Sequence, residues 1–156
     1  MLSRDNLNKI EELKKRFPDK KSLTIPVLWI AQEQYGWISG DTVREVADLL
    51  DLSPVDVHGV ASFYTMFNKK PVGKYHIQVC TNVSCSLLGA GRLVDYLCKK
   101  LDIRVGETTP EGRFTLTEVE CLGSCGTAPA VQINDEYYEN LTPEKLDRII
   151  SELKQG

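Results

Sequence analysis

The sequence contains no long uninterrupted run of apolar residues and no excess of basic residues, and each absence excludes a class of protein. A helix needs about 20 consecutive apolar residues to cross a bilayer. No stretch approaches that length, so we expect no direct membrane insertion. Lys and Arg number 19 against 22 Asp and Glu, which gives a net charge of −3. A phosphate-binding surface needs clustered basic side chains, so we expect no nucleic-acid partner.

The N-terminal segment, residues 1–17, lacks the apolar core of a signal peptide. It carries Asp5, Glu11 and Glu12, whereas transit peptides are poor in acidic residues. We therefore expect a cytoplasmic chain with prokaryotic processing. Disulfides are rare in such a reducing compartment, and the five cysteines are an odd number. Metal binding or redox chemistry is therefore the better interpretation of the cysteines.

The first part of the chain has the apolar spacing of helices. Pro18 ends one helical pattern, Gly36 follows another, and Pro54 suits the first position of a helix. Four segments show the spacing: residues 7–17, residues 27–31, residues 43–50 and a fourth that begins at Ser53. These patterns predict an N-terminal helical domain over residues 1–70, which ends in the polar stretch NKKPVG at residues 68–73.

Beyond that stretch the pattern changes to alternating strands and helices. Tyr75, Ile77 and Val79 alternate with polar residues, which indicates a strand that ends at Cys80. A further strand near Ile103 also fits the order. The other expected elements are a helix at residues 94–101, strands at residues 114–119, 130–133 and 136–138, and a helix from Thr142 to Leu153. This order predicts an α/β domain of thioredoxin type over residues 71–156.

Four of the five cysteines form two pairs that can share a metal group. Cys80 and Cys85 have four residues between them, Cys121 and Cys125 have three, and 35 residues separate the pairs. Each pair is expected in a loop after a strand. Four thiolates can hold a tetrahedral zinc ion or an iron–sulfur cluster. Structural zinc pairs usually lie closer together, so the spacing favours iron–sulfur, with zinc as the alternative. The small residues in both loops allow backbone N–H groups to approach the sulfurs.

Other chemistry fits the sequence less well. Neither loop contains a histidine, which excludes a Rieske site, and His58 and His76 are interpreted as ordinary packed or surface residues. Dithiol exchange of the thioredoxin kind uses Cys-x-x-Cys, a spacing absent here. Cys98 shares an apolar helix face and is expected to pack as a small hydrophobe. Pro129 precedes a predicted strand and is a candidate for a cis peptide bond, although only a minority of X-Pro bonds are cis.

Four stretches of the chain carry a family resemblance: SFYTMFNKKPVGKYHIQVC (residues 62–80), CTNVSC (80–85), CLGSCGTAPAVQIN (121–134) and YYENLTPEKLD (137–147). They resemble the thioredoxin-like [2Fe-2S] subunit of respiratory complex I, the NuoE family of NADH:quinone oxidoreductase. The resemblance covers nearly the whole chain. It implies a helical N-terminal part, a thioredoxin-like domain, and one [2Fe-2S] cluster held by Cys80, Cys85, Cys121 and Cys125.

The resemblance also implies partners. FMN and NADH would be bound only by a NuoF-like flavoprotein subunit, whose flavin exchanges single electrons with the cluster of this chain. Further subunits would complete the peripheral arm of a membrane-bound complex. The isolated chain is then expected to contain no catalytic residue and to oxidise no NADH. Related modules serve NAD-linked hydrogenases and formate dehydrogenases. A zinc scaffold and a stand-alone ferredoxin are the alternative functions.

An aromatic stretch precedes the expected domain boundary. Phe63, Tyr64, Met66 and Phe67 lie within five residues. Buried aromatics are common in cores, so core packing is the favoured interpretation. Docking of the flavoprotein is the alternative, because aromatic residues and Met are enriched at interfaces.

Overall fold

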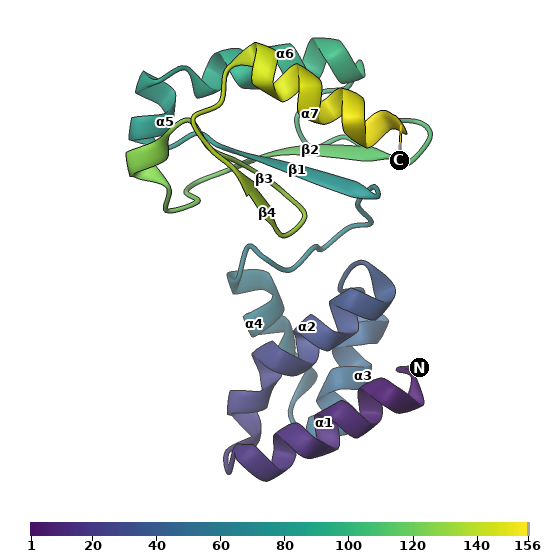
Figure 1. Cartoon of the computed structure of the whole chain (residues 1–156). Coiled ribbons are helices and arrows are strands. Elements are labelled where there is room, and N and C mark those ends of the chain that lie inside the picture. The colour runs from purple at the N-terminus through teal and green to yellow at the C-terminus, as the bar shows by residue number, and fades with distance from the viewer. Residues whose placement is uncertain (156) are drawn as a thin grey trace. The chain divides into compact units, whose positions relative to one another are not determined.

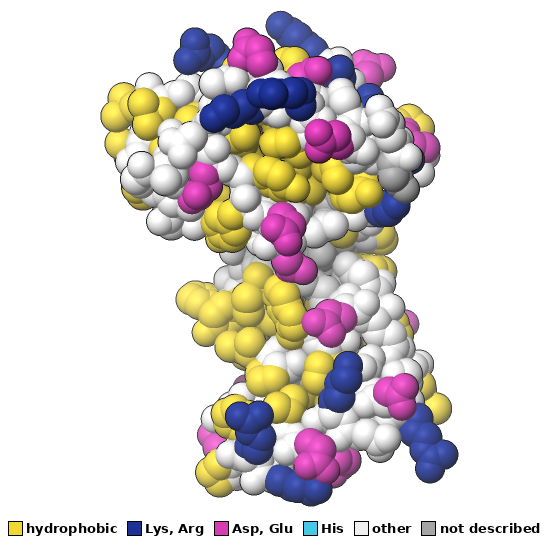
Figure 2. Space-filling view, viewed as in Figure 1, with side chains coloured by type: hydrophobic (Ala, Val, Ile, Leu, Met, Phe, Trp, Pro, Cys, Tyr) yellow, Lys and Arg dark blue, Asp and Glu magenta, His cyan; other side chains and the backbone are white. Residues whose placement is uncertain are grey.

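A computed structural model describes residues 1–155 of the chain, which divides into two compact units, Met1–Pro71 and Val72–Gly156 (Figure 1). The first unit is helical, and the second is a sheet with helices packed on it. The predicted α/β class, with helices before the sheet, is confirmed. No helix within residues 1–155 is both long and apolar enough to span a membrane. Acidic and basic side chains are interspersed over the face shown in Figure 2.

The helices of the first unit begin and end at the signals that the sequence carries. Gly36 ends the second α-helix in the left-handed conformation, with φ of 79°, which glycine adopts without steric cost. The Ser53 hydroxyl accepts a hydrogen bond from the Val55 N–H at the start of the fourth, at 3.3 Å. The elements are α1 (Arg4–Arg16), η1 (Lys20–Leu23), α2 (Thr24–Tyr35), α3 (Gly40–Leu50) and α4 (Pro54–Phe63).

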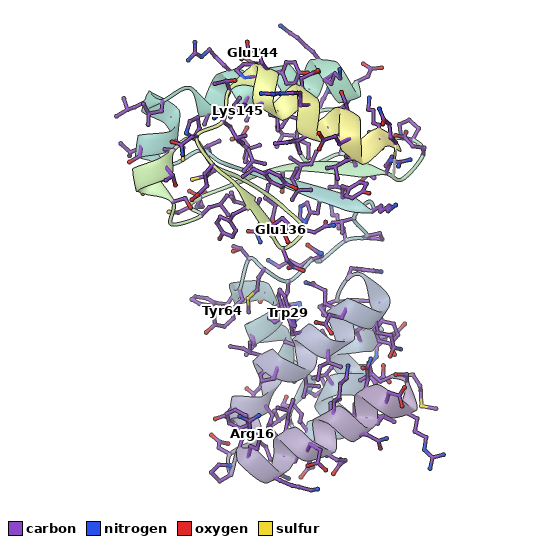
Figure 3. All side chains as sticks on the ribbon, viewed as in Figure 1. Arg16, Trp29, Tyr64, Glu136, Glu144 and Lys145 are labelled. Atoms are coloured by element: carbon purple, nitrogen blue, oxygen red, sulfur yellow. The ribbon has the colours of Figure 1, made fainter. Side chains whose placement is uncertain are left out.

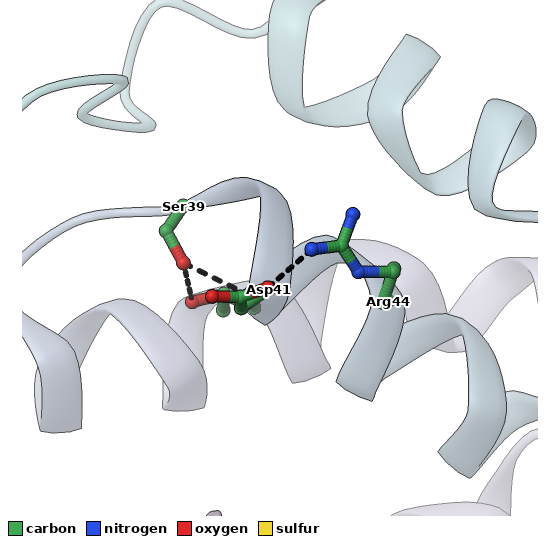
Figure 4. Close-up of polar contacts among 4 residues, drawn as sticks. Ser39, Asp41 and Arg44 are labelled. Carbon is green, nitrogen blue, oxygen red and sulfur yellow. Dashed lines mark hydrogen bonds and ion pairs between the residues drawn. The ribbon is translucent and has the colours of Figure 1, made fainter.

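The start of α3 shows how side chains stabilise these helix ends (Figure 4). The Ser39 hydroxyl accepts a hydrogen bond from the Thr42 N–H at 3.0 Å. Asp41, in the first turn, favours the positive end of the helix dipole and pairs with Arg44 one turn later. This exposed pair contributes little to stability by itself, whereas the serine cap satisfies a backbone donor that would otherwise lack a partner within the helix.

The helical unit has its own apolar core, formed by residues between Leu2 and Phe67. Phe67 lies after α4 and is only 2% exposed, and its ring centroid is 6.2 Å from that of Trp29 on α2. The Gln32 side chain fixes the segment before and after Phe67: it donates to the Met66 carbonyl at 3.0 Å and accepts from the Asn68 N–H at 2.6 Å. Figure 3 labels Trp29 and Tyr64 in this unit.

The second unit is built on a four-stranded sheet in the order β2-β1-β3-β4. The central pair β1 and β2 is parallel, while β3 is antiparallel to both β1 and β4. Alternate side chains of the strands, such as Ile77, Val79 and Leu116, are fully buried, as expected for one face packed against a core. The strands are β1 (Tyr75–Cys80), β2 (Phe114–Val119), β3 (Val131–Ile133) and β4 (Glu136–Tyr138).

Helices α6 (Ala90–Leu101) and α7 (Pro143–Gln155) cover one face of this sheet (Figure 1). Their buried residues, including Leu93, Leu97, Leu146 and Ile150, belong to the same core as the strand side chains. Cys98 is partly buried and packs against this core, in agreement with its interpretation as a small hydrophobe. The remaining elements are α5 (Val83–Leu87), α6 (Ala90–Leu101), η2 (Cys125–Thr127) and α7 (Pro143–Gln155).

The segment around Ile103 lies within the described part of the chain and forms no strand there, so that prediction was wrong. Asp102 ends α6 in the left-handed conformation, and the Ile103 N–H donates back to the Cys98 carbonyl at 3.2 Å. The Ile103 side chain is buried. The buried side chain of Ile103 therefore anchors the end of α6. Its backbone N–H is already hydrogen-bonded to Cys98.

Candidate metal centre

The parallel pairing of β1 and β2 explains why the two cysteine pairs meet. Cys80 is the last residue of β1 and is paired in register with Val119, the last residue of β2. Parallel strands end at the same edge of a sheet, so the segments that follow β1 and β2 leave this edge together. Cys85 lies in α5, Cys121 follows β2 by two residues, and Cys125 begins η2.

The expectation that both pairs lie in loops was wrong for Cys85, which lies in the short helix α5, and for Cys125, which begins the 3₁₀ helix η2. The Asn82 side chain begins this helix by accepting a hydrogen bond from the Val83 N–H at 2.8 Å. The same side chain donates to the Glu120 carbonyl at 2.8 Å, next to Cys121, so it joins the two cysteine segments. An Asn at a helix start is a recognised capping signal, and this residue could have predicted the helix.

The four thiols lie close enough to interact. Hydrogen bonding by Cys85 and Cys121 lowers the pKa of Cys80, and charge interaction with Cys125 raises the pKa of Cys85. Burial acts most strongly on the pKa of Cys85 and raises it, and the neighbouring thiols Cys80 and Cys125 raise it further. Neighbouring thiols repel one another as thiolates, and this repulsion is relieved when a cation binds them.

Backbone N–H groups also point at the sulfurs. Burial raises the pKa of the Cys80 thiol, but hydrogen bonds from Asn82, Leu122 and the neighbouring thiols outweigh it, and the net pKa is lowered. Cys85 interacts with the Ala130 N–H. The Gly123 N–H donates to the Cys121 sulfur at 3.3 Å. Such donors stabilise anionic thiolates and the metal groups that they hold.

Gly123 shows why a glycine is needed in the second loop. Its φ is +76°, in the left-handed region, although nothing lies within 4 Å of an added Cβ. The backbone conformation, rather than a lack of space, therefore disfavours other residues. This conformation accompanies the donation from its N–H to the sulfur of Cys121.

The two pairs differ in exposure, because Cys80 and Cys85 are buried whereas Cys121 and Cys125 are exposed. Within residues 1–155, no three or more His, Cys, Asp or Glu side chains form a site for a single metal ion. A [2Fe-2S] cluster divides four thiolates between two irons. The donor set of four thiols with several backbone N–H groups fits this group.

The two histidines lie outside both cysteine segments of the chain. His58 is on α4 and exposed, and His76 is on β1, with its Nε2 2.9 Å from the Thr117 hydroxyl. Burial lowers the pKa of His76. The Ala128–Pro129 peptide bond, next to the second pair, is cis.

The aromatic stretch divides between core and surface. Phe67 is buried, which agrees with core packing, whereas Phe63 is 78% exposed and Tyr64 and Met66 are also exposed. The rings of Phe63 and Tyr64 meet edge to face at 5.1 Å. The docking alternative therefore applies only to these three side chains.

Comparison with known proteins supports the same interpretation. The family described as thioredoxin-like [2Fe-2S] ferredoxin matches residues 10–154. The chain is 47% identical over 152 residues to the E subunit of NADH-quinone oxidoreductase from Rickettsia conorii, a match that covers 96% of this chain and 91% of that protein. It is 44% identical over 145 residues to the E 2 subunit of the Rhizobium meliloti oxidoreductase, which covers 93% of this chain and 86% of that protein.

Solved structures show a similar fold. An NAD⁺-reducing [NiFe]-hydrogenase in the H₂-reduced state is similar with a TM-score of 0.71 and 26% identity, over 83% of this chain. The air-oxidised form gives a TM-score of 0.74 at 24% identity, over 85% of this chain. Each match spans only 23% of the hydrogenase chain. The resemblance predicted from the four sequence stretches is confirmed by the family match and by the NADH-quinone oxidoreductase relatives, and the chain belongs to the thioredoxin-like [2Fe-2S] ferredoxin family.

Proposed function

We propose that this chain is the electron-transfer subunit of an NADH:quinone oxidoreductase, with one [2Fe-2S] cluster on Cys80, Cys85, Cys121 and Cys125. The observation that supports the proposal is the parallel pairing of β1 and β2, which brings the two cysteine segments to the same edge of the sheet, with pairwise interactions between their thiols. The cluster would exchange single electrons with the FMN of a NuoF-like partner flavoprotein. The names of the Rickettsia and Rhizobium relatives support the parent complex.

A [2Fe-2S] cluster, when bound, accepts and returns one electron at a time. The residues of this chain hold it, shield it and adjust its potential. Cys80 and Cys85 would hold its buried side, and Cys121 and Cys125 its exposed side. The N–H groups of Leu122, Gly123 and Ala130 would stabilise the negative charge on the sulfurs. None of these groups needs to move a proton, so hydride acceptance from NADH would take place on the partner's flavin.

The two units are proposed to be separate domains, helical over residues 1–70 and cluster-binding over residues 71–156. Each unit has its own apolar core, and among the described residues no buried hydrophobic side chain belongs to both cores. Limited proteolysis should then cut first between residues 68 and 73. Initial cleavage inside α2 or β1 would contradict this division.

The proposal is tested by the metal content and spectra of the protein purified without oxygen. We expect about two irons and two sulfides per chain, a red-brown absorption that bleaches with dithionite, and a spin-half EPR signal in the reduced protein. Purified chain mixed with NADH should not turn over. A colourless protein with one zinc per chain would instead support a structural scaffold, and a cluster-bearing protein that never copurifies with a flavoprotein would support a stand-alone ferredoxin.

A further inference from the structure

The Asn82 side chain forms two hydrogen bonds that reach into both cysteine segments. Its carbonyl oxygen accepts from the Val83 N–H at 2.8 Å, which begins the helix that carries Cys85. Its amide nitrogen donates to the Glu120 carbonyl at 2.8 Å, directly before Cys121 in the chain. Asn82 and Glu120 are 38 residues apart, so this side chain links two segments that lie far from each other in the sequence.

The bond to Glu120 continues the pairing of the two parallel strands beyond their ends. Cys80 is in register with Val119, and the Thr81 N–H donates to the Val119 carbonyl at 3.1 Å. One residue later the backbone turns into α5, because Asn82 is the N-cap of that helix. The side chain of Asn82 then takes the place of the backbone as the donor to the next carbonyl, that of Glu120.

A side-chain amide suits this position because the two bonds need opposite partners. The Val83 N–H needs an acceptor and the Glu120 carbonyl needs a donor, and an asparagine amide offers one of each. An aspartate carboxylate would accept from the Val83 N–H but could not donate to Glu120. A serine hydroxyl would also cap the helix, but it lies one bond closer to Cβ than the amide nitrogen and falls short of the Glu120 carbonyl. Substitution can therefore remove the link and keep the cap.

A metal group shared between two separate segments depends on how they are held relative to each other. If the segments moved independently, their thiols would take up the binding arrangement only part of the time, and the affinity would fall by that fraction. The second segment has the greater need of a link, because Cys121 and Cys125 are exposed, as is Glu120. Residues that orient metal ligands from outside the coordination shell commonly change metal affinity by about 10- to 100-fold.

We propose that Asn82 is a positioning residue for the metal centre, whose side chain holds the segment of Cys121 in place against the segment of Cys80 and Cys85. This role rests on the proposed function, since it assumes that the four cysteines share one cluster. It adds a residue that binds no iron and yet determines how long the cluster is retained.

Asn134 provides a matched control near the other end of β1. Its side chain forms the same two kinds of bond, because it accepts from the His76 N–H at 2.9 Å and donates to the Lys74 carbonyl at 3.0 Å. These partners lie near the start of β1, whereas the first cysteine segment begins at its end. Asn134→Asp therefore removes an equivalent donor from the same unit, outside residues 80–85 and 121–125.

The experiment uses the full chain, purified without oxygen and with its cluster, as wild type, Asn82→Asp, Asn82→Ser and Asn134→Asp. An excess of iron chelator is added, and the decay of the visible absorption gives the rate of cluster loss. Both Asn82 variants should lose the cluster about 10-fold faster than wild type, while Asn134→Asp stays within about 2-fold of it. Circular dichroism should show that all four proteins are folded, since both Asn82 variants keep a helix cap.

The EPR spectrum of the reduced protein gives a second measurement, which a change in stability alone would not alter. The signal should broaden in Asn82→Asp and Asn82→Ser, because the cysteine ligands would occupy a wider range of positions. It should keep the wild-type shape in Asn134→Asp.

The outcomes distinguish the role of Asn82 from the proposed function. Wild-type rates and spectra in both Asn82 variants would overturn the role and leave the function in place. Faster loss in Asn82→Asp but not in Asn82→Ser would assign the effect to the added charge, and an equal acceleration in Asn134→Asp would assign it to the stability of the sheet. Either result overturns the positioning role. A wild-type protein that holds zinc, or no iron–sulfur cluster, would contradict the proposed function itself and the role of Asn82 with it.

Discussion

Replacing Phe67 by alanine should strongly destabilise the helical unit, whereas the same change at Phe63 should not. Phe67 is 2% exposed and packs against Trp29 at 6.2 Å between ring centroids. Phe→Ala changes in cores cost about 3–5 kcal/mol. A unit of this size has a total stability of about 4–11 kcal/mol, so the change removes a large part of it. Exposed Phe63 should cost within about 0.5 kcal/mol.

Urea unfolding followed by tryptophan fluorescence measures this effect in the correct unit. Both tryptophans, Trp29 and Trp37, lie in the first unit, so their emission reports its unfolding. With a slope of about 1–1.5 kcal/mol per M for a small unit, Phe67→Ala should lower the midpoint by about 2–5 M. Phe63→Ala should change it by less than about 0.5 M.

A conservative variant tests the physical cause. Phe67→Leu keeps most of the buried apolar volume and should destabilise less than Phe67→Ala. Similar midpoints for Phe67→Ala and Phe63→Ala, at an unchanged slope, would refute the burial of Phe67 and the reasoning built on it. The same Phe63→Ala protein also tests flavoprotein docking by the exposed aromatic side chains, because its fold should be intact.

Three further predictions concern the second unit. Cys85→Ser should lose the bound iron, whereas Cys98→Ser, which changes a thiol packed against the core, should retain it, as iron analysis would show. Burial and the hydrogen bond to Asp147 raise the pKa of Tyr96 to about 12, so its contribution to stability should be lost as pH rises from about 10 to about 12; Tyr96→Phe should flatten that part of the alkaline unfolding curve. Hydrogen bonds from Lys100 and then Tyr96 lower the pKa of Asp147, so its contribution should be present at neutral pH and lost as pH falls below about 4. Circular dichroism should show a smaller loss of stability between about pH 7 and about pH 3 in Asp147→Asn than in wild type.

The elements that the sequence predicts well are those with a local physical signal. Ser53 and Pro54 mark the start of α4, and the alternation of apolar with polar residues marks β1 and β2. The strand expected near Ile103 failed because an apolar residue after a helix can serve as an anchor for the helix end, and spacing alone does not distinguish the two roles. The short helix α5 is only five residues long, and its one local signal is the Asn82 cap inside the Cys80–Cys85 spacing.

The candidate site depended on both local and long-range information. The identity of the four cysteines could be predicted from their spacing and from the family resemblance. Their meeting required the parallel register that aligns Cys80 with Val119, which no local pattern specifies. The unequal burial of the two pairs also follows from tertiary packing, because α5 holds Cys85 inward while the segment after β2 leaves Cys121 exposed.

The aromatic stretch shows why composition alone cannot separate a core from an interface. Phe63 and Phe67 are four residues apart and would share one face of a continuous helix, so the sequence assigns them the same role. The structure ends α4 at Phe63, and the Phe67 N–H then donates to the Tyr64 carbonyl at 3.2 Å in a turn. This turn breaks the helical spacing and directs Phe67 into the core while Phe63 stays exposed. Of two neighbouring phenylalanines, one therefore contributes to the core and the other remains on the surface.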